Sequence, residues 1–256
     1  MEIVMKIHIF GSCSGTEPFP DRHQTAWALD HMDRLYWFDA GEGCGYTAHT
    51  AGVDLLSVSD IFISHSHLDH TGGLPHLLWT IRKLNSRLKK LPKYGDITVY
   101  SPQEDVYRGA LLLLGNRYQS TYRTNFVKET DGILLKNDHV TVTAQHNLHM
   151  KPTEEGYRSF SYLIEADGKK LVYSGDVASP EELDPWVSAG CDALLMETGH
   201  HSPTEICERW KDQRIGHLFF LHHGRAILSN FDALLKECRK ILPNVTFCND
   251  GDVFEL

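Results

Sequence analysis

The feature that most constrains this chain is the run from His65 to His70, H-S-H-L-D-H, which places four ligand-type side chains within six residues. It follows the apolar residues 61–63, which predict the end of a buried strand. An extended strand would send alternate side chains to opposite faces, and a helix would group positions three or four apart. A curled loop at a strand end can turn all four side chains inward, and we expect the run to be such a loop.

The residue types in this run are those that bind zinc, which accepts imidazole nitrogen and carboxylate oxygen. The chain holds 16 histidines, an unusual number that also directs attention to metals. A catalytic zinc ion uses about three protein ligands and keeps one position open for water, so four ligands are too many for one such site. They suit two metal ions about 3.5–4 Å apart that share a water or hydroxide, an arrangement typical of hydrolases.

The composition excludes several classes of protein. With 41% hydrophobic and 23% charged residues, the chain reads as an ordinary globular protein. No apolar run approaches the roughly 20 residues that cross a bilayer, and the first ten residues read as a strand rather than a secretion signal. We therefore expect a cytoplasmic protein without a membrane partner. The formal net charge of -9 argues against non-specific coating of nucleic acid, although it leaves a local basic patch open.

The six cysteines contain no Cys-x-x-Cys pair. This pattern indicates reduced, mostly buried thiols rather than a disulfide framework or a cysteine zinc site. Cys13 and Cys44 are expected to be buried small apolar residues rather than reactive thiols.

Short β-rich runs alternate with amphipathic stretches along the chain. Strands are predicted at residues 3–10, 26–29, 35–38, 61–64, 97–100, 140–144, 160–165, 170–174, 193–197, 217–221 and 245–248. Helices are predicted at residues 74–88, 104–114, 180–189, 203–211 and 231–241. Ser179 and Ser202 each precede a proline, which indicates helix starts capped by a hydroxyl.

Early strands are expected in adjacent hairpins, and later ones alternate with helices. This order predicts a mixed α/β (α+β) fold, a four-layer αβ/βα sandwich. No linker composition appears, so a single domain over residues 1–256 is expected. The segment 117–138 has weak periodicity and stays open between a loop, an edge strand and part of a substrate lid.

The H-S-H-L-D-H run resembles the H-x-H-x-D-H signature of the metallo-β-lactamase superfamily. Residues 11–18 (GSCSGTEP) and 38–43 (FDAGEG) are similar to the opening of the tRNase Z branch and of related phosphodiesterases. Residues 173–176 (YSGD) resemble the strand end whose aspartate bridges two metals, and residues 218–222 (LFFLH) resemble the last strand with its final histidine ligand. The resemblance spans residues 7–224 in the family's order and implies one metallo-β-lactamase-like domain.

Carried over residue by residue, the resemblance implies a site for two Zn²⁺ ions, with Mn²⁺ or Fe as alternatives. The implied ligands are His65, His67 and His149 for one metal, Asp69, His70 and His222 for the second, and Asp176 as the bridge. His149 is preferred to His146 because it lies five residues after Ala144, as the family's ligand does, although residues 151–158 form an insertion in the family pattern. His223 is likewise the rival of His222.

Two further fragments bear on the reaction class. Residues 195–198 (LMET) are similar to the H-E-A-T segment of tRNase Z, and residues 200–202 (HHS) to its H-S-T segment. The resemblance implies that Glu197 orients a ligand histidine, and that His201 lies beside the leaving-group oxygen as a proton donor or electrostatic stabiliser. Met196 departs from the family's histidine, and the chain has no glycine- and proline-rich arm of the kind that grips tRNA. The alternative for His201 is an ordinary histidine at a helix start.

These features favour a phosphodiesterase in which a metal-bridging hydroxide, oriented by Asp69, attacks phosphorus. The substrate would be a small phosphodiester or RNA, and a homodimer is left open. One rival is a two-metal hydrolase of a lactone or thioester, because the same nucleophile attacks carbonyl carbon and the fold supports many chemistries. Another is a non-catalytic binding scaffold, which the complete ligand set argues against.

Two surface features stay open between a functional and a structural explanation. Residues 82–93 hold six basic residues and no acid, which fits either a phosphate-backbone track or a solvated basic face. The glycines at 41, 43, 72 and 73 could place backbone amides near a substrate anion, but tight turns explain them equally well.

Overall fold

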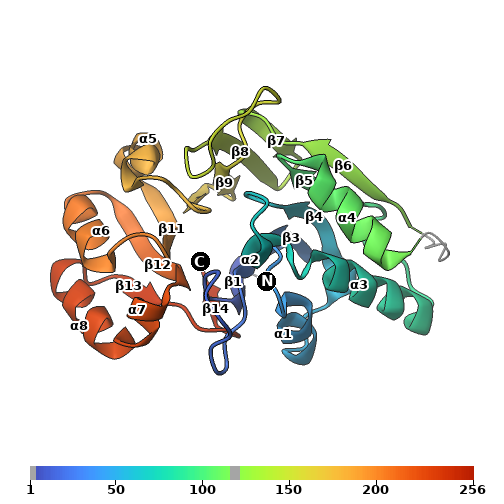
Figure 1. Cartoon of the computed structure of the whole chain (residues 1–256), viewed down its shortest axis with the longest axis horizontal. Coiled ribbons are helices and arrows are strands. Elements are labelled where there is room, and N and C mark those ends of the chain that lie inside the picture. Colours follow the sequence, from blue (N-terminus) through green and yellow to red (C-terminus); the bar gives the residue numbers. More distant parts are fainter. Residues whose placement is uncertain (1–3, 116–121) are drawn as a thin grey trace. The chain divides into compact units, whose positions relative to one another are not determined.

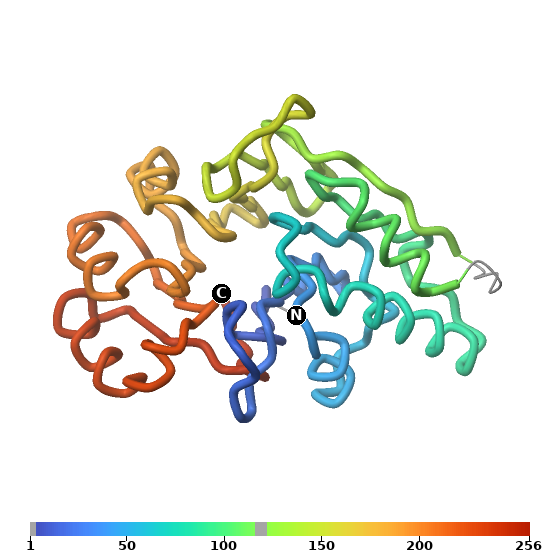
Figure 2. Tube along the Cα trace, viewed as in Figure 1, coloured from blue at the N-terminus to red at the C-terminus, as the bar shows by residue number. Residues whose placement is uncertain are grey.

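The computed structural model describes residues 4–115 and 122–256, which form two compact units. The first unit comprises residues 1–12, 18–129 and 249–256, and the second comprises residues 13–17 and 130–248. The trace in Figure 2 shows how the last residues return to the first unit, where β14 (Val253–Glu255) pairs with β1 (Lys6–Gly11). The prediction of one domain over the whole chain stays a prediction.

The first unit is built on a seven-stranded sheet in the order β14-β1-β2-β3-β4-β5-β6. Its further strands are β2 (Ala26–His31), β3 (Arg34–Phe38), β4 (Val58–Phe62), β5 (Ile97–Ser101) and β6 (Thr124–Lys128). The strands from β14 to β3 pair antiparallel, and those from β3 to β6 pair parallel. The carboxyl ends of β3, β4 and β5 therefore lie at one edge of the sheet.

Helices pack on one face of this sheet. They are α1 (Cys44–Thr50), the 3₁₀ turn η1 (Leu55–Ser57), α3 (Leu74–Leu88) and α4 (Glu104–Leu114), with α3 and α4 side by side in Figure 1. The short helix α2 (Leu68–Thr71) follows β4 and precedes α3. Leu77, Leu78 and Ile81 of α3 join Trp37 and Ile61 of the sheet in one core. Burial of such side chains is the main force that holds a helix on a sheet.

The other face of the sheet carries an aromatic ladder. Ring centroids of Trp27 and Phe38 lie 4.4 Å apart, those of Phe38 and Phe62 4.9 Å apart, and those of Phe62 and Tyr100 4.6 Å apart. All four side chains are buried. Cross-strand pairs of this kind fix the register of neighbouring strands, and with it the level at which β3 and β4 end.

The second unit repeats this plan with the order β13-β12-β11-β10-β9-β8-β7. Its strands are β7 (Gly132–Lys136), β8 (Val140–His146), β9 (Phe160–Ala166), β10 (Lys169–Tyr173), β11 (Cys191–Thr198), β12 (Ile215–His223) and β13 (Val245–Phe247). Strands β7 to β10 pair antiparallel, and β10 to β13 pair parallel. As in the first unit, the carboxyl ends of the parallel strands meet at one edge.

Helices of the second unit follow the parallel strands. They are η2 (Pro180–Leu183), α5 (Asp184–Ala189), α6 (Pro203–Trp210), α7 (Arg225–Leu228) and α8 (Phe231–Ile241). The core joins Trp210 of α6 and Cys238 of α8 to Leu194, Met196 and Phe220 of the sheet. The predicted α/β class, with hairpins first and helix-linked strands later, is confirmed.

The local predictions have different outcomes. Of the alternatives left open for segment 117–138, the structure shows the edge strand: β6 and β7 each lie at the edge of a sheet, while residues 116–121 lie outside the described residues. The predicted helix at 180–189 is divided into η2 and α5, because Pro185 lacks the N–H that a continuous helix would need. Ser179 caps η2 through its side chain, whereas Ser202 stands at the start of α6 without a side-chain cap.

The expectation for the cysteines is met. All six cysteines are free and buried, and burial raises the pKa of Cys44 to about 12. Among the described residues, no helix combines the length and the apolar character that crossing a membrane requires.

Candidate metal centre

In the first unit, the chain after β4 brings the nitrogens of His65 and His67 together. His65 Nδ1 lies 3.0 Å from Ser64 Oγ, which lies 2.8 Å from Asp39 Oδ2. The one hydroxyl proton of Ser64 goes to the carboxylate, so Ser64 accepts from His65 Nδ1. His65 Nε2 then points to His67 Nδ1, 3.0 Å away. Two nitrogen ligands of a tetrahedral zinc ion lie about 3.3 Å apart, close to this spacing.

Asp39, to which the sequence assigned no role, organises this loop. Its carboxylate accepts hydrogen bonds from Ser64 N at 2.7 Å and Ser64 Oγ, and lies 2.8 Å from His70 Nδ1. The side chains of Asp39 and His70 are fully buried. A carboxylate on one ring nitrogen is how proteins orient metal-binding histidines, and it turns His70 Nε2 toward Asp69 Oδ2, 3.6 Å away. Asp39 comes directly after β3, and β3 is the parallel neighbour of β4. This position at a strand end was the feature of the sequence that could have indicated its role.

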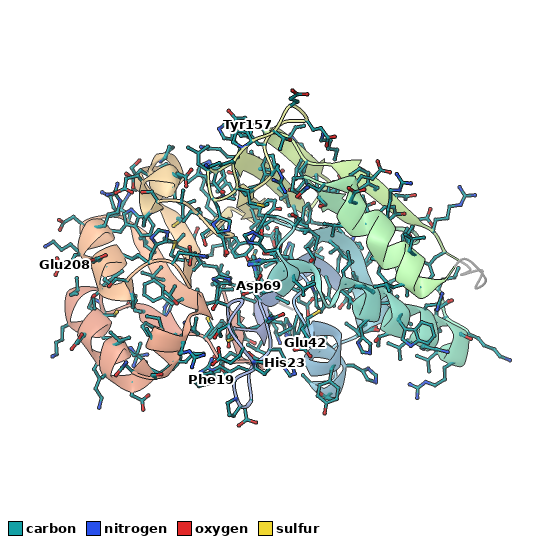
Figure 3. All side chains as sticks on the ribbon, in the orientation of Figure 1. Phe19, His23, Glu42, Asp69, Tyr157 and Glu208 are labelled. Carbon is teal, nitrogen blue, oxygen red and sulfur yellow. The ribbon has the colours of Figure 1, made fainter. Side chains whose placement is uncertain are left out.

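Asp69 and His70 lie on the short helix α2 and not on the loop that the sequence predicts (Figure 3 labels Asp69). Thr71 Oγ1 donates to His67 O at 3.0 Å, and Gly72 N donates to Leu68 O at 2.6 Å, which closes the turn. Four residues are too few to reveal a helical period in a sequence.

Close packing explains the glycines around this helix. A Cβ at Gly73 would lie 2.0 Å from Gly41 O, and one at Gly41 would lie 2.5 Å from Asp69 O. Gly43 has a φ of 81° and lies against the His23 ring. Ala40 N also donates to His70 O at 2.7 Å. These contacts fix α2 against the segment that follows β3.

In the second unit, Asp176 is the centre of a cluster of histidines. Its Oδ2 lies 3.4 Å from His222 Nε2, 3.7 Å from His149 Nε2 and 3.8 Å from His200 Nδ1. Asp176 follows β10, where Gly175 has a φ of 54° and turns the chain. One donor atom each from Asp176, Glu197, His200 and His222 lie within 4.8 Å of one another.

Glu197, at the end of β11, holds the histidines from behind. Its Oε1 lies 3.0 Å from His200 Nδ1, its Oε2 accepts from His200 N at 2.9 Å, and the same oxygen lies 3.6 Å from His222 Nδ1. Burial acts to raise the pKa of Glu197, but the contacts with His200 and His222 outweigh it and lower that pKa to about 2. Glu197 is therefore a buried anion, and it lies beside the buried carboxyl group of Asp176.

The two rivals for the ligand after β8 have different surroundings. His146 Nδ1 lies 2.7 Å from Asp131 Oδ2, and its ring stacks on Tyr157 with centroids 3.5 Å apart. His149 instead faces Asp176.

His222 and His223 also point to different groups. His223 Nδ1 lies 2.9 Å from Thr198 Oγ1 and its Nε2 lies 3.1 Å from Cys248 O, so both ring nitrogens are used inside the unit. His222 lies between Asp176 and Glu197 and has a φ of 53°, where residues other than glycine are uncommon. A Cβ at Gly199 would lie 2.5 Å from His222 Nδ1, so this position must be glycine for the ring to keep its place.

The structure brings His200, rather than His201, into the cluster around Asp176. His201 Nε2 lies 3.0 Å from Val177 O and 3.5 Å from Glu197 Oε1, and its side chain is largely buried. The side chain of His200 is nearly half exposed. The sequence pattern H-H-S permitted either choice, since it does not say which ring faces the strand ends.

Two residue sets, the His65 to His70 run in the first unit and the cluster around Asp176 in the second, each have donor atoms that suit a divalent metal ion. Imidazole nitrogens and carboxylate oxygens are the preferred ligands of zinc and similar ions. Here the Asp39 carboxylate binds the far nitrogen of His70 at 2.8 Å, and the Glu197 carboxylate faces the far nitrogen of His222 at 3.6 Å. Asp176 and Glu197 are both buried in the second unit. Two neighbouring buried anions are costly unless positive charge offsets them, which a cation would do.

Comparison with known proteins decides the family. The model of the beta-lactamase superfamily domain matches residues 37–234, which is most of the chain. The chain belongs to the metallo-β-lactamase superfamily. The resemblance predicted from the sequence is thereby confirmed, and with it a metal-dependent hydrolase.

Individual relatives agree with this membership. Ribonuclease BN of Enterobacter sp. (strain 638) is 28% identical over 315 residues, which cover 96% of this chain and 98% of that protein. The metallo-β-lactamase fold protein YhfI of Bacillus subtilis superposes with a TM-score of 0.77 at 18% identity, over all of both chains. The short form of human tRNase Z superposes with a TM-score of 0.70 at 18% identity, over 97% of this chain and 98% of that one. The structural likenesses show the metallo-β-lactamase fold.

Proposed function

We propose that this member of the superfamily is a dinuclear, zinc-dependent phosphodiesterase that acts on RNA or a small phosphodiester. The observation that carries the proposal is Asp176, a buried carboxylate faced by the ring nitrogens of His149, His200 and His222. Relatives named Ribonuclease BN and tRNase Z support the choice of a phosphodiester bond.

The proposed ligands are those that the family pattern implies. His65, His67 and His149 would hold one metal, and Asp69, His70 and His222 the other, with Asp176 as the bridge. The 3.0 Å spacing of the His65 and His67 nitrogens supports the first group, and the orientation of His149 and His222 toward Asp176 supports the part drawn from the second unit. His146 and His223 are left out because their ring nitrogens already face Asp131, Thr198 and the Cys248 carbonyl.

Two divalent ions bound there would lower the pKa of a water molecule to about 7 and screen the charge that develops on phosphate. The chain's own residues have three roles in this scheme. Asp39 binds the far nitrogen of His70, and Glu197 faces the far nitrogen of His222, so that the near nitrogens keep their direction. Asp69 accepts a hydrogen bond from the attacking water and aligns it with the phosphorus atom.

The leaving alkoxide needs a proton, and two neighbouring histidines compete for this role. His201 is the residue that the family pattern implies. The Nε2 atom of His201 faces the Val177 carbonyl, whereas His200 is more exposed and lies against Asp176 and Glu197. We therefore favour His200 as the proton donor and keep His201 as the alternative.

The function is tested by turnover of the metal-loaded protein on three substrate classes. We expect hydrolysis of bis(p-nitrophenyl) phosphate and of a short RNA with a 3′ extension, and little turnover of lactones or thioesters. Turnover of a lactone or thioester without any phosphodiester cleavage would replace the proposal with a carboxylic ester hydrolase. If the protein binds a substrate but turns none of them over, it would be a non-catalytic binding scaffold.

The proton donor is tested by comparing His200→Ala with His201→Ala. The variant that lacks the donor should lose roughly 10²- to 10⁴-fold in rate on an alkyl phosphodiester. It should lose much less on a p-nitrophenyl ester, because a nitrophenolate leaves without protonation. A proton donor that is not a ligand leaves metal content as in the wild type, and a loss of metal in His200→Ala would make His200 a ligand instead. Equal losses on the two substrates would indicate substrate positioning, and no loss in either variant would remove both histidines from the mechanism.

A further inference from the structure

The outer face of helix α3 carries a row of cations that the proposed chemistry does not use. The inner face packs on the sheet through Leu77, Leu78 and Ile81. The outer face and the turn after the helix carry the α3 basic stripe, which we define as Arg82, Lys83, Arg87, Lys89 and Lys90. All of these side chains except Arg82 are exposed, and Arg82 is partly buried.

The stripe is a concentration of positive charge on an acidic chain with a net charge of -9. Among the described acidic side chains, none forms an ion pair with Lys83, Arg87, Lys89 or Lys90. Several basic residues elsewhere do form ion pairs, as Lys6 does with Glu255, Lys93 with Asp54 and Lys211 with Glu208. The positive field of the stripe is therefore left for an outside anion.

Local contacts hold this surface in shape. The guanidinium of Arg82 and the ammonium of Lys83 lie 4.5 and 4.4 Å from the Trp79 ring centroid. Asn85, which is buried, donates from Nδ2 to Lys90 O at 2.7 Å and ties down the turn after the helix. A surface with this much order loses less conformational entropy when it binds a partner.

The stripe also has a defined place relative to the metal-binding run. Helix α3 starts at Leu74, directly after the turn that carries Asp69 and His70. At a rise of about 1.5 Å per residue, Lys83 lies about 14 Å and Arg87 about 20 Å along the helix from that start. A strand whose scissile phosphate lies at the metal run would have its flanking phosphates within this range, because phosphates repeat every few ångströms along a nucleic-acid strand.

We propose that the α3 basic stripe binds the phosphate backbone of an RNA strand, on one side of the bond that is cut. This inference rests on the proposed phosphodiesterase function and adds to it the surface that selects a polyanionic substrate over a small ester. An anionic lipid surface would also attract these cations, and the exposed leucines Leu88 and Leu91 lie beside them. The place of the stripe on the helix that follows the metal-binding run favours RNA, and vesicle binding tests the other case.

The test is a charge reversal with a matched control. Lys83→Glu/Arg87→Glu changes an i, i+4 pair on α3, and Lys236→Glu/Lys240→Glu makes the same change on the exposed side of α8. Fluorescence anisotropy of a labelled single-stranded RNA at several salt concentrations gives the dissociation constant and its salt slope without any need for hydrolysis.

Loss of two phosphate contacts should lower the salt slope by about 1.4 and weaken binding about 25-fold at roughly 0.1 M salt. The α8 variant should bind like the wild type. In turnover assays, the α3 variant should show a raised KM for RNA, while its rate on bis(p-nitrophenyl) phosphate should match that of the wild type. Thermal unfolding and metal content of each variant check that the fold is intact.

Equal losses in the α3 and α8 variants would show a general effect of charge and overturn the proposal. Unchanged RNA binding, together with loss of binding to phosphatidylserine vesicles in the α3 variant, would overturn it in favour of a membrane surface. RNA binding that depends on the stripe in a protein that cleaves no phosphodiester would instead support the stripe and refute the proposed function.

Discussion

His146 and His149 lie three residues apart, and their different surroundings allow a direct experiment. His149 faces Asp176, whereas His146 is bound to Asp131. His149→Ala should lower the bound metal and remove most activity, because a vacant ligand position weakens the site. His146→Ala should change both quantities little.

Elemental analysis and turnover on bis(p-nitrophenyl) phosphate measure the two effects. His146→Ala is the matched control, since it removes the same side chain from the same segment. The opposite pattern would assign the ligand to His146.

The residue scale also shows what a sequence reveals about a site. Ligand type is visible in the sequence, so the run from His65 to His70 and the Ser-Gly-Asp turn at Asp176 could be selected. The choice between two neighbouring histidines as the ligand was less well determined by the sequence. His222 and His223 lie on one strand end, and which ring turns toward Asp176 depends on a backbone with a φ of 53° at His222.

Groups that hold the ligands were harder still to predict. Asp39 lies 31 residues before His70 in the chain, and only the register of β3 against β4 brings them together. Glu197 was assigned through family resemblance, because nothing in its local sequence marks it as the partner of His200 and His222.

A pH effect on stability is expected from His217, on β12. Its Nε2 lies 2.9 Å from Thr246 Oγ1, and burial, followed by the charge of Arg239, lowers its pKa below the ordinary 6.5. The unfolded chain then binds more protons below pH 6.5 than the folded protein, so stability falls as the pH drops through that value. His217→Gln can keep the bond to Thr246 and cannot take the proton.

Urea unfolding of the wild type and of His217→Gln at pH 8 and pH 5 measures this effect. The free energy of unfolding of the variant should fall furthest below that of the wild type at pH 8, and this difference should be smaller at pH 5. A difference that is the same at both values would show that His217 does not titrate differently in the folded state.

At the scale of elements, Gly199 joins the end of β11 to the position of His222. A Cβ there would lie 2.5 Å from His222 Nδ1, so Gly199→Ala must displace the ring from between Asp176 and Glu197. We expect a loss of roughly 10- to 100-fold in metal affinity or activity, as is typical when the support of a ligand is disturbed. Isothermal titration with Zn²⁺ measures the affinity.

Gly109, on α4, provides the control. A Cβ at Gly109 meets nothing within 4 Å, so Gly109→Ala should leave metal binding unchanged and stabilise the helix by up to about 1 kcal/mol. Wild-type zinc affinity in Gly199→Ala would show that His222 tolerates the shift.

Elements themselves were predictable in proportion to their length. The helices at 74–88, 104–114 and 231–241 agree with α3, α4 and α8 because each shows a clear amphipathic period over at least three turns. Short elements such as α2, α7 and β14 have too few residues to show any period. The edge strand β6 was ambiguous because it lacks the apolar alternation of a buried strand.

At the scale of the whole molecule, the chain uses one connectivity twice. Each unit begins with antiparallel strands and continues with parallel ones, and candidate ligands follow the parallel strands in both. His65 follows β4, Asp176 follows β10, and His222 lies at the end of β12.

Metal removal should lower both the thermal stability and the activity of the protein. Seven ligands exceed the needs of one tetrahedral ion, so we expect close to two metal ions per chain under zinc-replete conditions. Ligands that bind only the folded state stabilise it by mass action, by about 2.7 kcal/mol at a concentration 100 times the dissociation constant. Chelation should lower the melting temperature and abolish hydrolysis, and added Zn²⁺ should restore both.

Asp176→Asn separates the two-metal proposal from a single-ion site. If Asp176 bridges two cations, the variant removes the anion that lets them lie close together, and it should lose metal, activity and the Zn²⁺-dependent rise in melting temperature together. Elemental analysis and calorimetry of the loaded and chelated proteins measure these effects. One ion per chain in the wild type, or full metal content and rate in Asp176→Asn, would contradict the bridge, because a carboxylate shared by two cations cannot be replaced by a neutral amide without loss of affinity.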